Sequence, residues 1–163
     1  MIHRAGSRLE SLGGKLSSMK SNLHESTCSS AKPAPRTAFR VSNVTRGTAL
    51  ATFVEIADTA RTRRKGLLGR ASLSTGEGLW ITPCESVHTC FMHFPIDLIY
   101  LSREKRIEKL KSDVVPWRLS ACLSAGSVLE LGAGSIRASR SEQGDLVEFV
   151  ALAEDAVDHP TKS

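Results

Sequence analysis

The sequence predicts a mostly β protein with a minor α+β character: a compact β barrel or jelly-roll-like sandwich with one or two short helices. Short runs rich in β-branched and apolar residues, tight turns between them and little sustained helical periodicity lead to this class. The 163 residues, 40% hydrophobic and 24% charged, suit one globular domain. We expect this β-rich domain to span residues 38–155.

The first 37 residues differ in composition from the rest, and we expect them to be a disordered, basic, Ser-rich tail. Residues 1–36 hold six of the 22 basic and two of the 17 acidic side chains, so the remainder is nearly neutral. Leu and Met recur there at helical spacing, which leaves a transient helix or an organelle transit segment open. Residues 156–163 are expected to be a second disordered tail.

The cellular compartment is inferred from cysteines and hydropathy. Four cysteines are too few for a secreted disulfide scaffold, and no apolar run suits a signal peptide or a transmembrane helix. We therefore expect a cytoplasmic protein with reduced thiols and no transmembrane segment.

The predicted strands share β-branched composition or alternation. In chain order they are Phe39–Val44, Leu50–Ala57, Leu79–Thr82, Ile96–Leu101, Arg106–Leu110, Ser127–Leu131 and Leu146–Leu152, with an extended segment at Val114–Trp117. A surface helix is expected over residues 60–69, after N-cap candidates Asp58 and Thr59. A turn or short helix is expected before Ser139. In the strand over residues 127–131, alternation puts Val128 and Glu130 on one face.

Short motifs along the domain resemble a known family. In chain order they are Ala57-Asp58-Thr59, Arg63-x-x-Gly66-Leu67-Leu68-x-Arg70, Glu77-Gly78, Pro95-Ile96-Asp97, Val128-Leu129-Glu130-Leu131-x-Ala133-Gly134 and Gly144-Asp145. This order resembles domain-of-unknown-function family 192, over roughly residues 54–149. The resemblance implies a compact β barrel or sandwich and no known activity. It implies structural roles for the motif residues Arg63, Gly66, Asp97, Gly134, Gly144 and Asp145.

One stretch departs from the family's commoner Trp-Met-Lys-Asn-Thr motif. It reads Cys84-x3-His88-Thr89-x2-Met92, which resembles a branch of the family. If residues 88–94 are extended, His88, Cys90 and Met92 share one face, where imidazole, thiol and thioether form a soft-ligand set for zinc or copper.

Three residues form the predicted metal set: Cys84, His88 and Cys122. The chain lacks the C-x2-C pairs of zinc ribbons, so ordinary core packing of Cys and Met is the competing interpretation. A nucleophilic thiol, Cys84 or Cys90 beside His88, is a further hypothesis.

Charged motif residues receive structural hypotheses. Asp97 lies inside the apolar run IDLIYL, so we expect a partner, most simply an Arg. Arg63 is expected to pair with Asp97 or Glu130, within a basic helix that either is solvated or binds an anion. Gly66 is expected to let the helix end lie close to the sheet.

Phosphate loops, dinucleotide fingerprints, nucleophile elbows and H-E-x-x-H are absent from the sequence. The leading interpretation is therefore a non-catalytic binding or accessory module for a small molecule or protein partner, with no catalytic residue and no cofactor. Its predicted surface is His88, Met92, Pro116, Trp117 and Arg118. The alternative is a metal- or thiol-dependent protein, a class that includes enzymes. A third hypothesis has the basic tail and helix contacting nucleic acid or a membrane surface, and nucleic acid is the weaker partner because the domain is nearly neutral.

Overall fold

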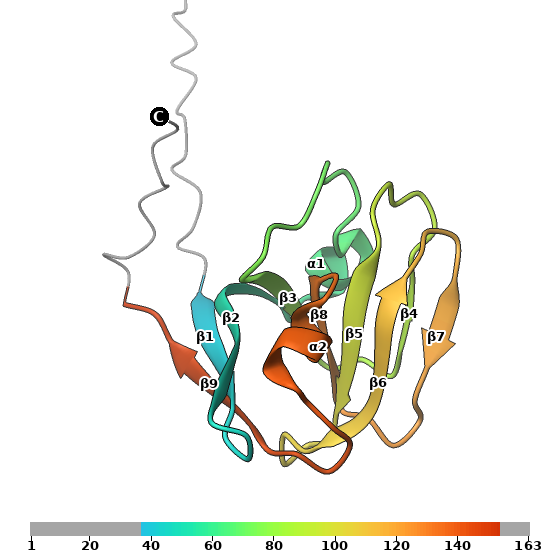
Figure 1. The fold of residues 1–163 in the computed structure, drawn as a ribbon. Helices are drawn as coiled ribbons and strands as arrows, with labels where there is room; N and C mark the ends of the chain where they lie inside the picture. The colour runs from blue at the N-terminus through green and yellow to red at the C-terminus, as the bar shows by residue number, and fades with distance from the viewer. Residues whose placement is uncertain (1–36, 154–163) are drawn as a thin grey trace, which may run out of the picture. The chain divides into compact units, whose positions relative to one another are not determined.

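The structure, a computed structural model, describes residues 37–153, which form a curled β sheet with two short helices (Figure 1). The predicted mostly β class is confirmed, whereas the predicted tails, 1–37 and 156–163, fall outside the described residues apart from residue 37. The strands are β1 (Ala38–Asn43), β2 (Thr48–Ala57), β3 (Glu77–Ile81), β4 (Ser86–His88), β5 (Ile96–Leu101), β6 (Ile107–Val114), β7 (Leu119–Ala121), β8 (Ser127–Gly132) and β9 (Val147–Ala151); the helices are α1 (Ala60–Lys65) and α2 (Ser135–Ser139).

Seven strands form one sheet in the order β6-β5-β8-β3-β2-β1-β9, and β4 and β7 form a separate antiparallel pair. Within the large sheet only β2 and β3 pair in parallel. The edge strands β6 and β9 meet at one end. Ile107 N donates to Asp145 O at 2.9 Å, Gly144 N to Ile107 O at 2.8 Å, and Val147 N to Lys105 O at 3.0 Å. This contact curls the sheet into a partial barrel (Figure 1).

The central strands β5 and β8 are buried on both faces of the sheet. Ile99 and Leu129 pack into one apolar cluster, inside the curl, which Ile136 of α2 joins. Leu98 and Tyr100 pack into a second cluster on the opposite face, with residues that follow α1 or belong to β4. Two-sided burial therefore comes from covering the outer face with α1 and the β4–β7 pair, as in Figure 1.

Glu130 occupies the outer face of β8, as the alternation predicts. Leu129 and Leu131 belong to the inner cluster, and Val128 belongs to the outer cluster. Because Glu130 alternates with these leucines, its side chain lies on the outer face with Val128, and the residue is only 4% exposed. The fold thus places a titratable group inside its core.

The segment after β4 is not the extended strand that the sequence suggested. β4 ends at His88, Met92 N donates to Thr89 O at 3.3 Å, and Phe91 has φ 65°. A turn therefore replaces the strand, and the expected shared face of His88, Cys90 and Met92 is wrong. β4 and β7 themselves were not predicted, because three-residue strands carry little periodicity.

Asp97 is fully buried, and its expected Arg partner is wrong. Its Oδ1 accepts a hydrogen bond from Asp113 N at 2.9 Å, and its Oδ2 accepts one from Ile136 N at 2.8 Å. Backbone amides thus satisfy the carboxylate, which joins β5 to β6 and to α2.

Among residues 37–153, no helix is long and apolar enough to cross a membrane.

Candidate functional site

A pocket of about 390 Å³ lies between α1 and the segment around β4, above β3 and β8. We call it the α1 pocket. Its wall combines the basic residues Arg63, Arg64 and Lys65, the apolar residues Leu67, Leu68, Ile81, Val87 and Met92, and the polar residues Cys84, His88 and Glu130. This volume lies in the range of small-molecule sites, which combine apolar walls with a few polar groups.

A second, larger hollow of about 720 Å³ is lined by Glu55, Arg70 and part of α1. Arg70 Nη2 lies 3.0 Å from Glu55 Oε2, so these two charges already compensate each other. The α1 pocket differs because its only acidic side chain, Glu130, has no such partner.

The helix α1 forms one wall of the pocket, and local interactions define where this helix begins and ends. Thr59 caps the helix: its Oγ1 accepts from Thr62 N at 3.1 Å, and Thr59 N donates to Thr62 Oγ1 at 3.0 Å. Gly66 ends it with φ 48° and ψ −133°, a conformation that glycine adopts far more readily than other residues. A Cβ at Gly66 would approach only Arg63 O, at 3.8 Å. The expected close approach to the sheet is therefore wrong, and the requirement for glycine is conformational.

Arg63 is held against the pocket wall by backbone carbonyls. Its Nη1 donates to Asp58 O and, at 3.5 Å, to Thr82 O. The expected ion pair with Asp97 or Glu130 does not form. The Nε and Nη2 donors of Arg63 have no partner among the described residues, so the guanidinium is fixed in place and retains donor capacity.

Glu130 forms no hydrogen bond with any residue that the structure describes, and its Oε2 is completely buried. Burial disfavours the ionised form and raises the pKa of Glu130 to about 8, although the positive charge of Arg70 lowers it in part. At neutral pH the carboxyl is therefore mostly protonated, with an O–H donor that lacks an acceptor among the described residues.

Cys84 lines the pocket as a thiol. Burial raises its pKa, and its Sγ lies 3.1 Å from Ser86 O, to which the S–H donates. The nucleophilic hypothesis requires the opposite shift, toward thiolate at neutral pH. Burial also raises the pKa of Tyr100, whose hydroxyl lies close enough to Cys84, Cys122 and Glu130 to interact with them electrostatically. Buried Tyr100 and half-buried Cys84 therefore lie near Glu130, and burial favours the neutral form of each of these three groups.

The predicted ligand surface is divided by the turn at Thr89. Exposed His88 and buried Met92 line the α1 pocket, whereas Pro116, Trp117 and Arg118 do not. Thr89 joins the two parts: Thr89 N donates to Arg118 O at 2.9 Å, and Trp117 N donates to Thr89 O at 3.0 Å. Binding by all five residues stays a prediction.

Trp117 instead contacts Phe91. Their rings lie 4.6 Å apart between centroids, both side chains are more than half exposed, and both residues have positive φ, 62° and 65°. A left-handed conformation costs a non-glycine residue roughly 1–2 kcal/mol. The hydrogen bonds of Thr89 hold the segments that carry this pair.

The predicted metal set does not gather at one point. Among residues 37–153, no three His, Cys, Asp or Glu side chains form a group that could hold a metal ion. Cys84, Cys90 and Cys122 are free cysteines. A zinc or copper site using Cys84, His88 and Cys122 stays a prediction.

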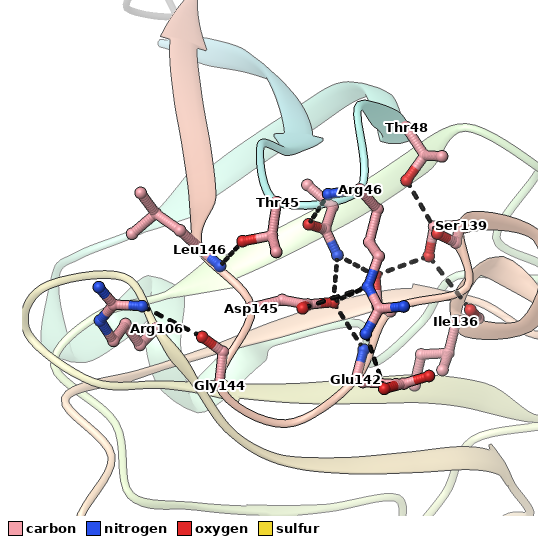
Figure 2. Close-up of polar contacts among 12 residues, drawn as sticks. Thr45, Arg46, Thr48, Arg106, Ile136, Ser139, Glu142, Gly144, Asp145 and Leu146 are labelled. Carbon is pink, nitrogen blue, oxygen red and sulfur yellow. Dashed lines mark hydrogen bonds and ion pairs between the residues drawn. The ribbon is translucent and has the colours of Figure 1, made fainter.

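The Gly144-Asp145 motif belongs to a hydrogen-bond network at the other end of the sheet (Figure 2). Asp145 Oδ2 accepts from Asn43 Nδ2 at 2.9 Å, from Arg46 Nε at 3.0 Å and from Glu142 N at 2.8 Å. Burial acts to raise the pKa of Asp145, but these hydrogen bonds outweigh it, and the pKa is lowered. The motif thus ties the β1–β2 turn to the start of β9.

Sequence reasoning named Glu130 as a motif residue, on one face with Val128, and as a possible partner of Arg63, but missed its place in the pocket. A signal was present: Glu130 is the one acid in the otherwise apolar strand SVLELG. Arg64 and Lys65 were treated as a basic helix, and their position beside Glu130 depends on how α1 packs.

The fold and pocket define a small partial-barrel β protein with a ligand-sized pocket and an unpartnered buried carboxyl group. The chain belongs to the DUF192 family, described as "Uncharacterized ACR", which residues 41–149 match. It is similar to the UPF0127 protein TK1120 of Thermococcus kodakarensis, with 31% identity over 127 residues, 74% of this chain and 80% of that protein.

Two solved structures share the fold. One is from Sinorhizobium meliloti, called a "putative transcription regulator", with TM-score 0.62, 21% identity and coverage of 70% of this chain and 93% of that one. The other is a protein of unknown function from Novosphingobium aromaticivorans, with TM-score 0.57, 24% identity and coverage of 68% and 83%. At these identities, the likeness establishes the fold alone.

Proposed function

We propose that this protein is a non-catalytic binding module that holds a small molecule in the α1 pocket. The observation that carries the proposal is Glu130, a buried carboxyl group that lines the pocket and has no hydrogen-bond partner among the described residues. Leaving such a group unsatisfied costs about 1–3 kcal/mol. A bound ligand that supplies the missing partner would recover part of this free energy.

The pKa of Cys84 favours binding over thiol chemistry. Because burial raises this pKa, little thiolate is available at neutral pH. Four cysteines in 163 residues are also too few for a secreted disulfide scaffold, so we place the binding function in the cytoplasm.

A protein partner is the second candidate, and the exposed Phe91–Trp117 pair favours it. Strained backbone at two adjacent exposed aromatic residues is typical of functional surfaces. We treat this surface as separate from the α1 pocket, because neither residue lines the pocket.

Native mass spectrometry of the full chain, purified without chelator, tests the proposal first, since a bound small molecule adds mass that denaturation removes. A fragment screen by amide NMR then locates binding, with shifts expected at Gly66 and Val87 in the pocket wall. Ala60→Trp should block these shifts, because Ala60 is an exposed residue that lines the pocket. Ala138→Trp, at an exposed position of α2, is the matched control. Unbound protein in both experiments would refute the proposal.

A further inference from the structure

Resting on the proposed function, we propose that the α1 pocket takes a small organic carboxylate, held between the carboxyl group of Glu130 and the guanidinium of Arg63. The ligand would carry one carboxylate and a short aliphatic body. Three features of the pocket lead to this class: its hydrogen-bonding capacity, its charge and its apolar wall.

The hydrogen-bonding capacity comes from two fixed donors. A buried carboxyl without a partner among the described residues is held protonated, since an isolated buried charge is very costly, and so Glu130 offers an O–H. The pKa of about 8 agrees with this state. Arg63, fixed by Asp58 O and Thr82 O, offers its remaining N–H groups. Both residues line the same pocket of about 390 Å³, and the charged group that acts on Glu130 in the unliganded protein is Arg70.

The net positive charge of the pocket lining favours an anionic ligand. Arg63, Arg64 and Lys65 line it, and Glu130 is its only acidic residue. With Glu130 protonated, the pocket presents cations without a compensating carboxylate, so an amine would be repelled and a carboxylate attracted. Hydrogen bonds between an acid O–H and a carboxylate, and between Arg and a carboxylate, are among the short, strong class.

The apolar wall limits the charge and size of the ligand. Leu67, Ile81 and Met92 are buried residues of the pocket lining, within a volume of about 390 Å³. A short aliphatic chain would gain free energy against them. Inorganic phosphate has no apolar body to pack against these side chains, and the desolvation of its charge would oppose binding.

The protonation of Glu130 makes this binding depend on pH. The charged or titratable groups around Glu130 are Arg70, Cys84 and Tyr100 by electrostatic coupling, and Arg63, Arg64, Lys65 and His88 by lining the same pocket. Ionised Glu130 would repel a carboxylate, so affinity should fall as the pH rises past about 8.

The test is an amide NMR titration of the full chain with hexanoate, hexanamide, hexylamine and inorganic phosphate at about pH 6.5. Hexanoate should shift the amides of Gly66 and Val87 and bind at least about 10-fold more tightly than hexylamine or phosphate. Hexanamide, which keeps the acceptor oxygen but lacks the charge, should bind more weakly than hexanoate.

Variants test the donor at Glu130 and the positive charge of the pocket wall separately. Glu130→Gln retains an N–H donor, so hexanoate binding should persist at about pH 6.5 and lose its decline at about pH 9. Arg64→Ala should weaken hexanoate without unfolding, because Arg64 is exposed. The matched control Arg137→Ala, an exposed arginine of α2 outside the pocket, should leave affinity unchanged.

Each outcome decides the proposal. Preferential binding of hexanoate, with a pH dependence that Glu130→Gln abolishes, supports it. Equal or tighter binding of hexylamine, hexanamide or phosphate at the same amides overturns the carboxylate assignment and leaves a small-molecule pocket standing. No shift with any probe or any screened fragment overturns both the carboxylate and the proposed function.

Discussion

Two buried carboxyl groups at different places in this fold contrast in almost every respect. Asp145 and Glu130 are each 4% exposed. Asp145 accepts hydrogen bonds from Asn43, Arg46 and Glu142, and its pKa is lowered (Figure 2). Glu130 has no hydrogen-bond partner among the described residues, and its pKa is raised to about 8. Burial without hydrogen-bond donors raises the pKa of Glu130, whereas the donors around Asp145 lower the pKa of that group.

The contrast separates a structural role from a binding role. The donors around Asp145 come from the β1–β2 turn region and from the segment before β9, so the carboxylate holds these two segments together. Glu130 makes no such hydrogen bond with any residue that the structure describes. Its carboxyl group instead lies at a pocket, where its missing partner can come from outside the chain.

The largest expected effect is that of Glu130→Gln on the pH dependence of the unfolding free energy. With a folded pKa of about 8 and an unfolded pKa near 4.5, Glu130 retains its proton only in the folded state between these values. Its stabilisation is fully present below about pH 4.5 and is lost toward pH 8, by up to about 1.4 kcal/mol per pH unit. The difference in unfolding free energy between wild type and Glu130→Gln should therefore fall by about 3 kcal/mol from roughly pH 5.5 to 7.5.

Urea denaturation of both proteins at several pH values measures this difference. A difference that stays constant over this range would mean that Glu130 is ionised and paired, which would remove the contrast with Asp145.

Neutralising each carboxyl with its amide isostere should give the next largest effect. Asp145→Asn places an NH₂ group among three donors and should cost about 2–3 kcal/mol. Glu130→Gln at about pH 5.5 replaces a group that is already neutral and should cost about 1 kcal/mol or less. Chemical denaturation measures both values, and equal costs would contradict different roles for the two groups.

The stability of the protein at acidic pH should depend on Asp145 in the opposite direction, because stability is lost there as the pH falls. Because the pKa of Asp145 is lowered, its stabilisation is present above the unfolded pKa near 3.8 and is lost as the pH falls through the folded pKa. Asp145→Asn should flatten this limb of the stability curve, whereas Glu130→Gln should leave it intact.

The smallest expected effect is on the rate at which iodoacetamide labels Cys84, on the pocket wall. Since burial raises its pKa, iodoacetamide should label Cys84 more slowly at neutral pH than it labels a thiol in an unstructured peptide. Peptide mass spectrometry over time gives the rate, and hexanoate should lower it further by occupying the pocket. Rapid labelling would instead support the thiol-dependent alternative.

Much of the fold could be predicted, because strong local patterns survive folding. Ile96–Leu101 is a strand with the predicted bounds, and the alternation in Ser127–Gly132 places Glu130 on the predicted face. Thr59 caps α1 as expected. β4 was missed, and the helix was predicted too long, because a few residues carry weak periodicity and Gly66 ends the helix at Lys65.

The candidate site was only half predictable. His88 and Met92 were named and do line the pocket, but Trp117 lies beyond the turn at Thr89 and faces Phe91 instead. Asp97 was expected to meet an arginine and meets two backbone amides. Such partners come from segments far apart in the chain, and no spacing rule identifies them.

The sequence by itself determined the β class, most strand positions, the capped helix and the fact that Glu130 shares a face with Val128. These features follow from side-chain periodicity and backbone preference, which act over a few residues. The tertiary structure alone decided that Asp145 is surrounded by donors and that Glu130 is not. The state of a buried carboxyl depends on groups that only folding brings within a few ångströms, and that distance is what separates a structural carboxylate from a candidate ligand site.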